Sequence, residues 1–260
     1  MSEAVAVFRS PQPHIQRISV DRPWVWLAAG WRDVLAAPRI SFAYGFALAA
    51  IGWLAIALLL KFELPYLVLP LSAGFFFVGP FIAVGLYEVS RRLKLGLPVD
   101  WETTLFAWKR NPGQIALMGL LLCLFHLAWM RMAQLLFALF EVRTASWDRF
   151  ADLAWFSTHS LPFMAVGIVL GALLAAGAFA IGAFSIPYLL DRKTSNLFEA
   201  IATSVAIVRL NPKPMLLWAV MIVLLTGLGM VLGLFGLIIT MPQVAYATWH
   251  ASRDIVRFDA

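Results

Sequence analysis

The stretch AWKRNPGQIALMG (residues 107–119) sets two basic residues, an asparagine and a proline close before a long apolar run. A similar phrase, IVRLNPKPMLLWA, stands at 207–219. Proline disfavours the helical conformation in the residue before it, so each phrase predicts that one helix ends and another begins at the proline. The apolar run predicts that the second helix enters a membrane. The phrase therefore indicates a corner between a surface helix and a membrane span.

The composition of the chain is that of a membrane protein. Of its 260 residues, 62% are hydrophobic and 13% are charged, whereas about a quarter of the residues in soluble domains are charged. Long apolar runs without charge are typical of membrane helices. The predicted spans are about 42–61, 66–90, 113–138 and 162–190, followed by two in the block 214–252, which folds back within TGLGMVLGLFG (226–236). We expect an all-α, polytopic bundle of about six membrane helices.

The basic residues predict how this bundle is oriented. With six spans, 16 of the 20 Lys and Arg residues fall on the side that holds both termini. The positive-inside rule then puts both termini in the cytoplasm, and we expect the chain in the cytoplasmic membrane. The net charge of +6 is explained by anionic lipid at the cytoplasmic face, so nucleic acid is not expected as a partner. The N-terminal segment lacks the apolar core and cleavage site of a signal peptide.

Apolar spacing before three prolines predicts an internal repeat. Counting back from Pro38, Pro112 and Pro212, apolar residues stand four, seven and eleven positions earlier, on one face of a helix. They are Val34, Trp31, Leu27, Trp108, Leu105, Trp101, Val208, Val205 and Ile201. We expect three short amphipathic helices on the cytoplasmic face, with this side towards lipid or the bundle. Asn111 and Asn211 are expected to cap the helices that follow them.

The helices that return to the cytoplasmic face resemble one another too. Aligning Pro80 with Pro242 gives GPFIAVGLYEVSRRL against MPQVAYATWHASRDI, two segments that share an aromatic residue and a basic end. The fourth span carries its proline at Pro187. The chain is therefore predicted to hold three parallel copies of a surface helix plus a helical hairpin.

These copies define the expected domain organisation. The repeats are placed at about 22–92, 98–192 and 196–253, and the second has an insertion at 141–160 on the non-cytoplasmic side. Together they form one membrane domain, 22–256. A flexible cytoplasmic segment, 1–21, is expected before this domain, and a short tail, 257–260, after it.

Two polar residues near the cytoplasmic face are candidate functional residues, because ionisable groups in or near spans are rare. Glu88 is expected to pair with Arg91 or Arg92, and a role in coupled transport is the alternative. His250 occupies the position that aligns with Glu88 in the last returning helix.

Two further candidates lie in the third span. His126 is about 14 residues into that span and is expected to form a hydrogen bond within the bundle, with haem or metal ligation as the alternative. Arg131 is expected to reach the interface with its long side chain. Its alternative role is to bind a lipid phosphate or a substrate anion.

The sequence carries no pattern that is typical of an active site. It has no paired carboxylates, no Gly-x-Ser-x-Gly segment, no second cysteine and no pair of histidines with the spacing of metal ligands on one helix. We therefore expect a protein that is not an enzyme and that has no cofactor.

Five segments resemble the bacterial family of predicted integral membrane proteins called domain of unknown function 2189 (DUF2189). They are WLAAGWRDVLAAP (26–38), VGPFIAVGLYEVSRRL (78–93), FAWKRNPGQIAL (106–117), IPYLLDR (186–192) and ATWHASRD (247–254). The resemblance extends from about Ile18 to Val256. It implies an integral membrane protein, and it brings no activity, cofactor or catalytic residues to this chain.

Two classes of function follow from these expectations. The first is a non-enzymatic accessory, assembly or scaffold component that contacts membrane lipids and a partner within a membrane protein complex. The second is a transporter or channel for a small solute or a lipid. Sparse charge within the spans favours the first class, and a deep polar cavity between the spans would favour the second.

Overall fold

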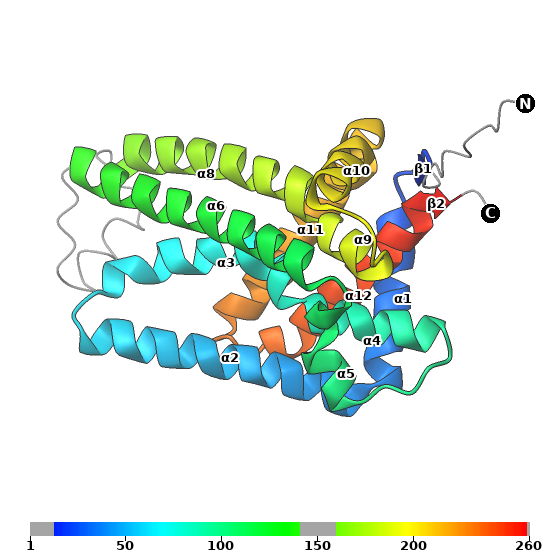
Figure 1. The fold of residues 1–260 in the computed structure, drawn as a ribbon. Coiled ribbons are helices and arrows are strands. Elements are labelled where there is room, and N and C mark those ends of the chain that lie inside the picture. The colour runs from blue at the N-terminus through cyan, green and yellow to red at the C-terminus, as the bar shows by residue number, and fades with distance from the viewer. Residues whose placement is uncertain (1–12, 141–159, 259–260) are drawn as a thin grey trace, which may run out of the picture.

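The computed structural model describes residues 13–140 and 160–258, which form a helical bundle with one pair of short strands at its end (Figure 1). The predicted all-α class is confirmed. The elements are β1 (Pro13–Ile15), α1 (Arg22–Ala36), α2 (Pro38–Lys61), η1 (Pro65–Leu67), α3 (Val68–Ile82), α4 (Val84–Lys94), α5 (Trp101–Leu105), η2 (Ala107–Arg110), α6 (Pro112–Leu139), α8 (Ser160–Gly182), α9 (Ser185–Asp191), α10 (Leu197–Leu210), α11 (Pro212–Val231), α12 (Leu237–Ile255) and β2 (Val256–Phe258). The predicted insertion at 141–160 lies outside the described residues, except for its last residue.

Five helical segments are long and apolar enough to cross a membrane. They are Pro38–Lys61, Pro65–Lys94, Pro112–Leu139, Leu161–Asp191 and Pro212–Val231. The sixth predicted span, α12, is not among them, because polar residues fill its second half. It packs along α1, α2 and α11 instead, and most of its side chains are buried. The count of six spans therefore stays a prediction.

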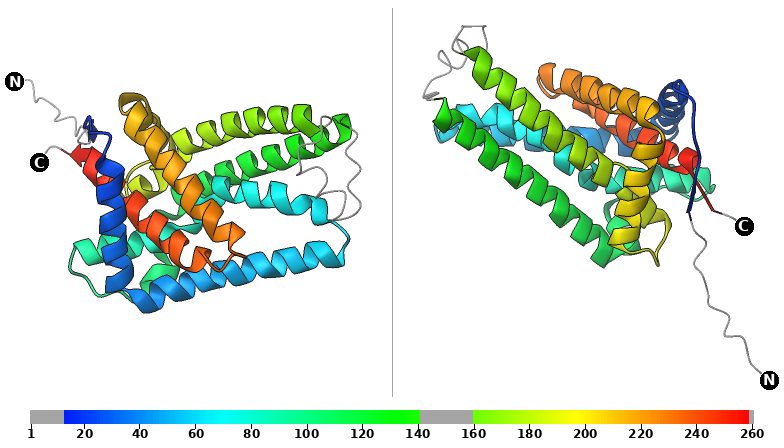
Figure 2. Two further views of the ribbon diagram at one scale, coloured as in Figure 1. Left: turned by 180° about the vertical axis from the view of Figure 1, so that it is seen from behind. Right: turned by 90° about the horizontal axis from the view of Figure 1, so that it is seen from above.

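The short helices gather at the end of the bundle that also holds both strands, which we call the polar end (Figures 1 and 2). α1, α5 and α10 lie there, and α2, α6 and α11 begin there. β1 pairs antiparallel with β2, and the backbone N–H of Gln16 donates to the carbonyl oxygen of Ile255 at 2.9 Å. Residues 13–18, part of the segment expected to be flexible, are thus held against the C-terminal end of α12.

Each of the three corner prolines begins a helix, at Pro38, Pro112 and Pro212. Proline suits this position because the first helical N–H needs no partner within the helix. The hairpin between α11 and α12 turns at residues 232–236, inside the predicted Gly-rich segment. There Gly233 and Leu234 adopt φ values of 66° and 67°. Only glycine takes this left-handed conformation without a steric cost.

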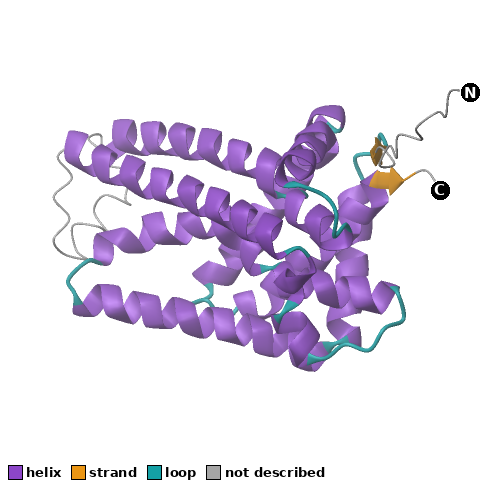
Figure 3. Ribbon diagram, viewed as in Figure 1, coloured by secondary structure: helices purple, strands orange, loops and turns teal. Residues whose placement is uncertain are grey.

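The three prolines of the returning helices act differently from one another. Pro80 lies inside α3, which ends two residues later at Ile82 before the chain continues as α4. Pro187 lies in the first turn of α9, after a break that separates this helix from α8. Pro242 lies inside α12, which continues without a break. Figure 3 shows the helices on either side of these breaks and the loops that join the hairpins.

The surface helices bury a face that lies one residue away from the predicted one. Gly30, Thr104 and Ser204, each eight residues before a corner proline, are the positions at which α1, α5 and α10 meet the bundle. A Cβ atom on Gly30 would lie 2.8 Å from the backbone nitrogen of Ala247 in α12. The predicted face is less buried, apart from Val34, which is fully buried. The exposed residues of this face on α1 and α5–η2 are Trp31, Trp101, Leu105 and Trp108.

Each surface helix packs on a returning helix of a different predicted copy. α1 contacts α12, α5 contacts α4, and α10 contacts α8 and α9. α1 and α12 lie side by side in Figure 2, so the first predicted copy contacts the last. This is the arrangement that three equivalent copies would produce, and the repeat itself remains a prediction.

Candidate functional site

A charged cluster surrounds Glu88 at the polar end. Glu88 is 3% exposed and accepts two hydrogen bonds of 2.7 Å from Arg91, one from Nε and one from Nη2. Arg92 approaches the same carboxylate to 3.8 Å, and Arg110 approaches it to 3.7 Å. Nε of Arg110 also donates to the carbonyl oxygen of Leu190 at 2.9 Å. Burial and then the neighbouring charge of Arg91 hold the pKa of Arg110 below its ordinary value. The cluster thus joins α4 to η2 by an ion pair and η2 to α9 by a charge-assisted hydrogen bond.

His250 belongs to a second polar group, which joins α1, α4 and α12. Its Nε2 lies 2.8 Å from Oδ2 of Asp33, and the hydroxyl of Ser90 donates to the same oxygen at 2.6 Å. Both bonds converge on one carboxylate oxygen, so this group fixes three helices against one another. The contacts do not bring the hydroxyl of Ser90 to the imidazole of His250, which a nucleophile and its base would require.

The two candidates in α6 do not form a site. The Nδ1 of His126 is buried without a hydrogen-bond partner among residues 13–140 and 160–258, so the expected hydrogen bond within the bundle is not formed at this atom. Its ring packs directly onto Gly74, where a Cβ atom would lie 2.2 Å from the ring. Arg131 is exposed, and its Nη1 donates to Oε1 of Gln134 at 3.2 Å. The position of the His126 ring is therefore set by its contact with α3. The side chain of Arg131 is held by a hydrogen bond within α6.

The two corner asparagines do not cap the helices that follow them, in contrast to our expectation. Neither side chain accepts a cap hydrogen bond. The amide of Asn111 donates to the carbonyl oxygen of Ser195 at 3.0 Å, in the segment before α10. Asn211 accepts from the backbone N–H of Ile18 at 2.9 Å and donates to the carbonyl oxygen of Gln16 at 3.0 Å, in the segment before α1. Each asparagine therefore holds the chain that leads into another surface helix.

Within the described part of the chain, no three His, Cys, Asp or Glu residues are grouped as metal ligands would be. The charged groups described above are instead paired with one another at the polar end. A cavity without charged lining residues lies elsewhere in the bundle.

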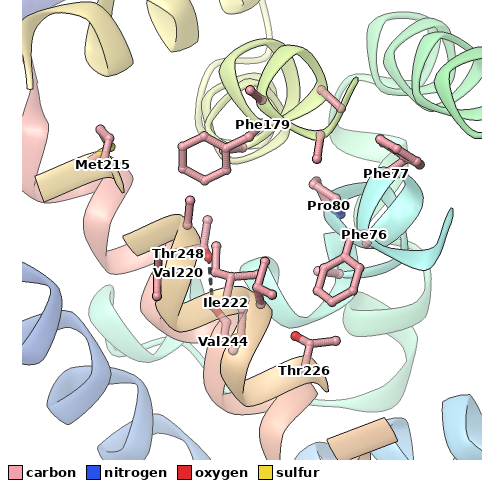
Figure 4. A pocket seen from close by; sticks show the side chains of 18 of the residues that line it. Phe76, Phe77, Pro80, Phe179, Met215, Val220, Ile222, Thr226, Val244 and Thr248 are labelled. Atoms are coloured by element: carbon pink, nitrogen blue, oxygen red, sulfur yellow. Dashed lines mark hydrogen bonds between the residues drawn. The ribbon is translucent and has the colours of Figure 1, made fainter. Parts of the chain in front are cut away.

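An apolar cavity of about 620 Å³ lies between α3, α8, α11 and α12 (Figure 4). Phe76 and Phe77 approach it from α3, and Phe179 approaches it from α8. Its polar lining residues are Tyr87, Thr226 and Thr248. The hydroxyl of Thr248 donates to the carbonyl oxygen of Val244 at 2.8 Å, a bond within its own helix. No charged side chain of the described residues lines this cavity.

The cavity opens sideways along α11. Four of the residues that line it on this helix, Leu216, Val220, Val223 and Leu224, are also exposed at the surface. On the facing helix, Ala175 and Ala176 line the cavity and are exposed as well. In a membrane, the surroundings of this opening are lipid chains.

The sequence carried a weak signal for this cavity. Alanines crowd the end of α8 in the segment GALLAAGAFAIGAF (171–184), and their small side chains leave space that large residues would fill. Small residues in a membrane helix usually indicate close helix packing. In α8, some of the small residues pack closely against another helix, as expected, and others face the cavity. The periodicity of the sequence does not distinguish the two groups.

The comparisons with known proteins agree with this fold. Residues 68–191 match the family model described as predicted integral membrane protein (DUF2189). No curated protein and no solved structure matches the chain. The matched segment contains the second and third of the five motifs in full and nearly all of the fourth. The protein is thus an integral, multi-pass helical membrane protein, and its segment from α3 to α9 is similar to the DUF2189 family.

Proposed function

We propose that the protein is a non-enzymatic membrane component that holds the acyl chain of a lipid in its lateral cavity. The observation that carries this proposal is the cavity of about 620 Å³, with apolar walls and a sideways opening. A void of this size loses the dispersion contacts that its lining atoms would otherwise make. Water is a poor occupant because it needs two to four polar partners. A lipid chain restores the contacts and is present on all sides.

The walls do not favour a polar solute. Such a solute would give up its hydrogen bonds with water, and an apolar environment returns few of them. The lining offers three hydroxyl-bearing side chains, and the hydroxyl of Thr248 is already bonded to its own helix. Lipid transport is the alternative that the same cavity would serve, and it differs from stable holding in the rate of lipid exchange.

The accessory role is supported by the arrangement of the charged groups. The clusters around Glu88 and Asp33 tie helices together at the polar end, so they stabilise the bundle that encloses the cavity. The positive-inside rule places this end in the cytoplasm, and we propose that orientation together with the cytoplasmic membrane as the location.

Lipid retention on purification tests the proposal. The protein is purified in mild detergent, and bound lipid is counted by native mass spectrometry. We expect about one lipid to remain bound, and Ala176→Phe or Ala219→Phe to reduce its occupancy severalfold because each ring fills the cavity. Leu173→Phe is the matched control, since Leu173 is exposed on α8 and does not line the cavity. Equal lipid retention in all four proteins would rule out the cavity as the binding place.

A further inference from the structure

The corner between α10 and α11 borders the cavity at the polar end. Val208, in the last turn of α10, and Pro212, the first residue of α11, both line the wall. Each is followed directly by a basic residue, Arg209 and Lys213. The cavity therefore begins beside two positive charges.

These two charges are not compensated within the protein. Arg209 and Lys213 are exposed, and neither forms an ion pair with any residue in 13–140 or 160–258. Other arginines at the polar end pair with carboxylates. They are Arg22, Arg91, Arg92, Arg110, Arg192 and Arg253. An uncompensated cation at a membrane surface attracts anionic lipid.

Unpaired cations elsewhere lack a cavity beside them. Lys109 occupies the equivalent corner before α6, but its ammonium lies over the ring of Phe106 at 4.0 Å, and its neighbour Trp108 does not line the cavity. Lys94 ends α4 and is exposed. Of these three places, the corner between α10 and α11 is the one where unpaired charge adjoins the apolar wall of the cavity.

The lining of the cavity extends along α11 from the polar end to beyond the middle of the membrane. On α11 its lining runs from Pro212 to Thr226, which is about 21 Å at 1.5 Å per residue. The hydrocarbon core of a bilayer is about 30 Å thick, so one leaflet contributes roughly half of that. A chain that starts at the corner can lie along this wall to beyond the middle of the membrane.

Resting on the function proposed above, we infer that the bound lipid is an anionic phospholipid. Its phosphate lies between Arg209 and Lys213 at the corner, and one acyl chain lies in the cavity along α11. The charges select the headgroup, while the apolar wall binds the chain regardless of headgroup. The lipid belongs to the leaflet at the polar end.

A competition between two lipids with the same acyl chains tests the headgroup. The purified protein is exchanged into nanodiscs that contain phosphatidylglycerol and phosphatidylcholine in equal amounts, and the tightly bound lipid is identified by native mass spectrometry after extraction. We expect the wild-type protein to retain phosphatidylglycerol with a preference of about tenfold or more, since two cations contribute. Arg209→Gln with Lys213→Gln should reduce this preference to near unity and leave the total bound lipid unchanged.

The matched control is Lys94→Gln with Lys109→Gln, which removes two unpaired cations at the same end of the bundle. This variant should keep the preference of the wild type. Retained preference in the Arg209→Gln, Lys213→Gln protein would overturn the headgroup site, and so would equal loss in both double variants, which would indicate general surface charge.

The Ala219→Phe protein separates this inference from the function on which it rests. If Ala219→Phe lowers total bound lipid and the Arg209→Gln, Lys213→Gln protein keeps its preference, the cavity binds lipid and the headgroup assignment alone is wrong. If Ala219→Phe binds as much lipid as the wild type, the proposed function fails whatever the preference. Equal melting temperatures of these variants in detergent show that each comparison is made on folded protein.

Discussion

The corner at Pro38 and the corners at Pro112 and Pro212 make the same turn by different means. At the second and third corners, a buried asparagine holds the segment that leads into the next surface helix. Ala37 occupies that position at the first corner and has no polar side chain. Its carbonyl oxygen instead accepts from the hydroxyl of Ser41, which lies 2.8 Å from the hydroxyl of Tyr246 in α12.

The first corner relies on close helix packing where the others rely on side-chain hydrogen bonds. A Cβ atom on Gly45 would lie 2.4 Å from the carbonyl oxygen of Ile238, so α2 and α12 touch backbone to backbone. The helix starts show the same difference, since Asp100 and Asn196 cap α5 and α10 with their side chains while Asp21 makes no such bond. A turn can thus be kept while its support changes from polar contacts to packing.

The packing at the first corner should give the largest effect when broken. Gly45→Leu forces α2 away from α12, and we expect the free energy of unfolding to fall by about 3 kcal/mol, since overpacking at a backbone contact cannot relax by a side-chain rotation. Gly227→Leu is the matched control, because no heavy atom lies within 4 Å of a Cβ atom there. Unfolding in detergent by denaturant titration measures both. A loss of similar size at Gly227 would show that helix propensity, and not packing, sets the cost.

Removing the asparagines should have the next largest effect. Asn211→Ala takes away bonds to Ile18 and Gln16 and leaves their polar groups without a partner, so we expect a loss of about 2 kcal/mol. Asn111→Ala should lose about 1 kcal/mol, because its side chain makes fewer short bonds. The same titration ranks them, and hydrogen exchange of residues 16–18 should rise in Asn211→Ala alone. Unchanged exchange there would contradict the role given to Asn211.

Removing a helix cap should have a smaller effect, and this effect should differ between α10 and α1. Asn196→Ala removes the bond of 2.9 Å from the backbone N–H of Glu199, and we expect a loss of about 1 kcal/mol. Asp21→Ala removes no cap bond and should change stability by less. Helix-specific hydrogen exchange in α10 and in α1 compares the two. Equal effects would mean that the cap of α10 does not stabilise it.

The smallest effect expected is a pH dependence confined to α5. Hydrogen bonds from the backbone and side chain of Thr103 hold the pKa of Asp100 below its ordinary value of 3.8. A lowered folded pKa means that the stabilisation is complete above the unfolded value and is lost as the pH falls through the folded value. We expect exchange in α5 to rise below about pH 4 in the wild type, and the rise to be absent in Asp100→Asn. The cap at Asn196 does not titrate, so α10 serves as the internal control.

Much of this fold follows from local features of the chain. The prolines and the apolar runs predicted where α2, α6 and α11 begin, and the glycines at 226–236 predicted the last hairpin, because these signals act on the backbone of their own residues. The residues that meet the bundle, Gly30, Thr104 and Ser204, lie one position from the predicted face, because tertiary contacts with α12, α4 and the α8–α9 segment decide which side of each helix is buried. Apolar spacing marks the side that faces lipid as readily as the side that faces protein.

The candidate site depended even more on distant contacts. The ion pair of Glu88 with Arg91 involves neighbours on one helix, so its spacing could be read in the sequence. The bond between His250 and Asp33 joins residues that are 217 positions apart, and the cavity is bounded by four helices. The carbonyl groups that bind Asn111 and Asn211 belong to backbone segments whose composition carries no mark of the contact. These features arise only when the helices assemble.

The contact of α1 with α12 also fixes the timing of assembly during synthesis. Trp26 of α1 is 1% exposed and packs against Trp218 of α11 with ring centroids 5.7 Å apart, and its indole nitrogen donates to Asp254 at 2.9 Å. A ribosome adds about 5–20 residues per second, so roughly 10–40 s separate the emergence of α1 from that of its partners. During that interval α2 and α4 can cover part of α1, but the packing around Trp26 is complete only once α11 and α12 have been made.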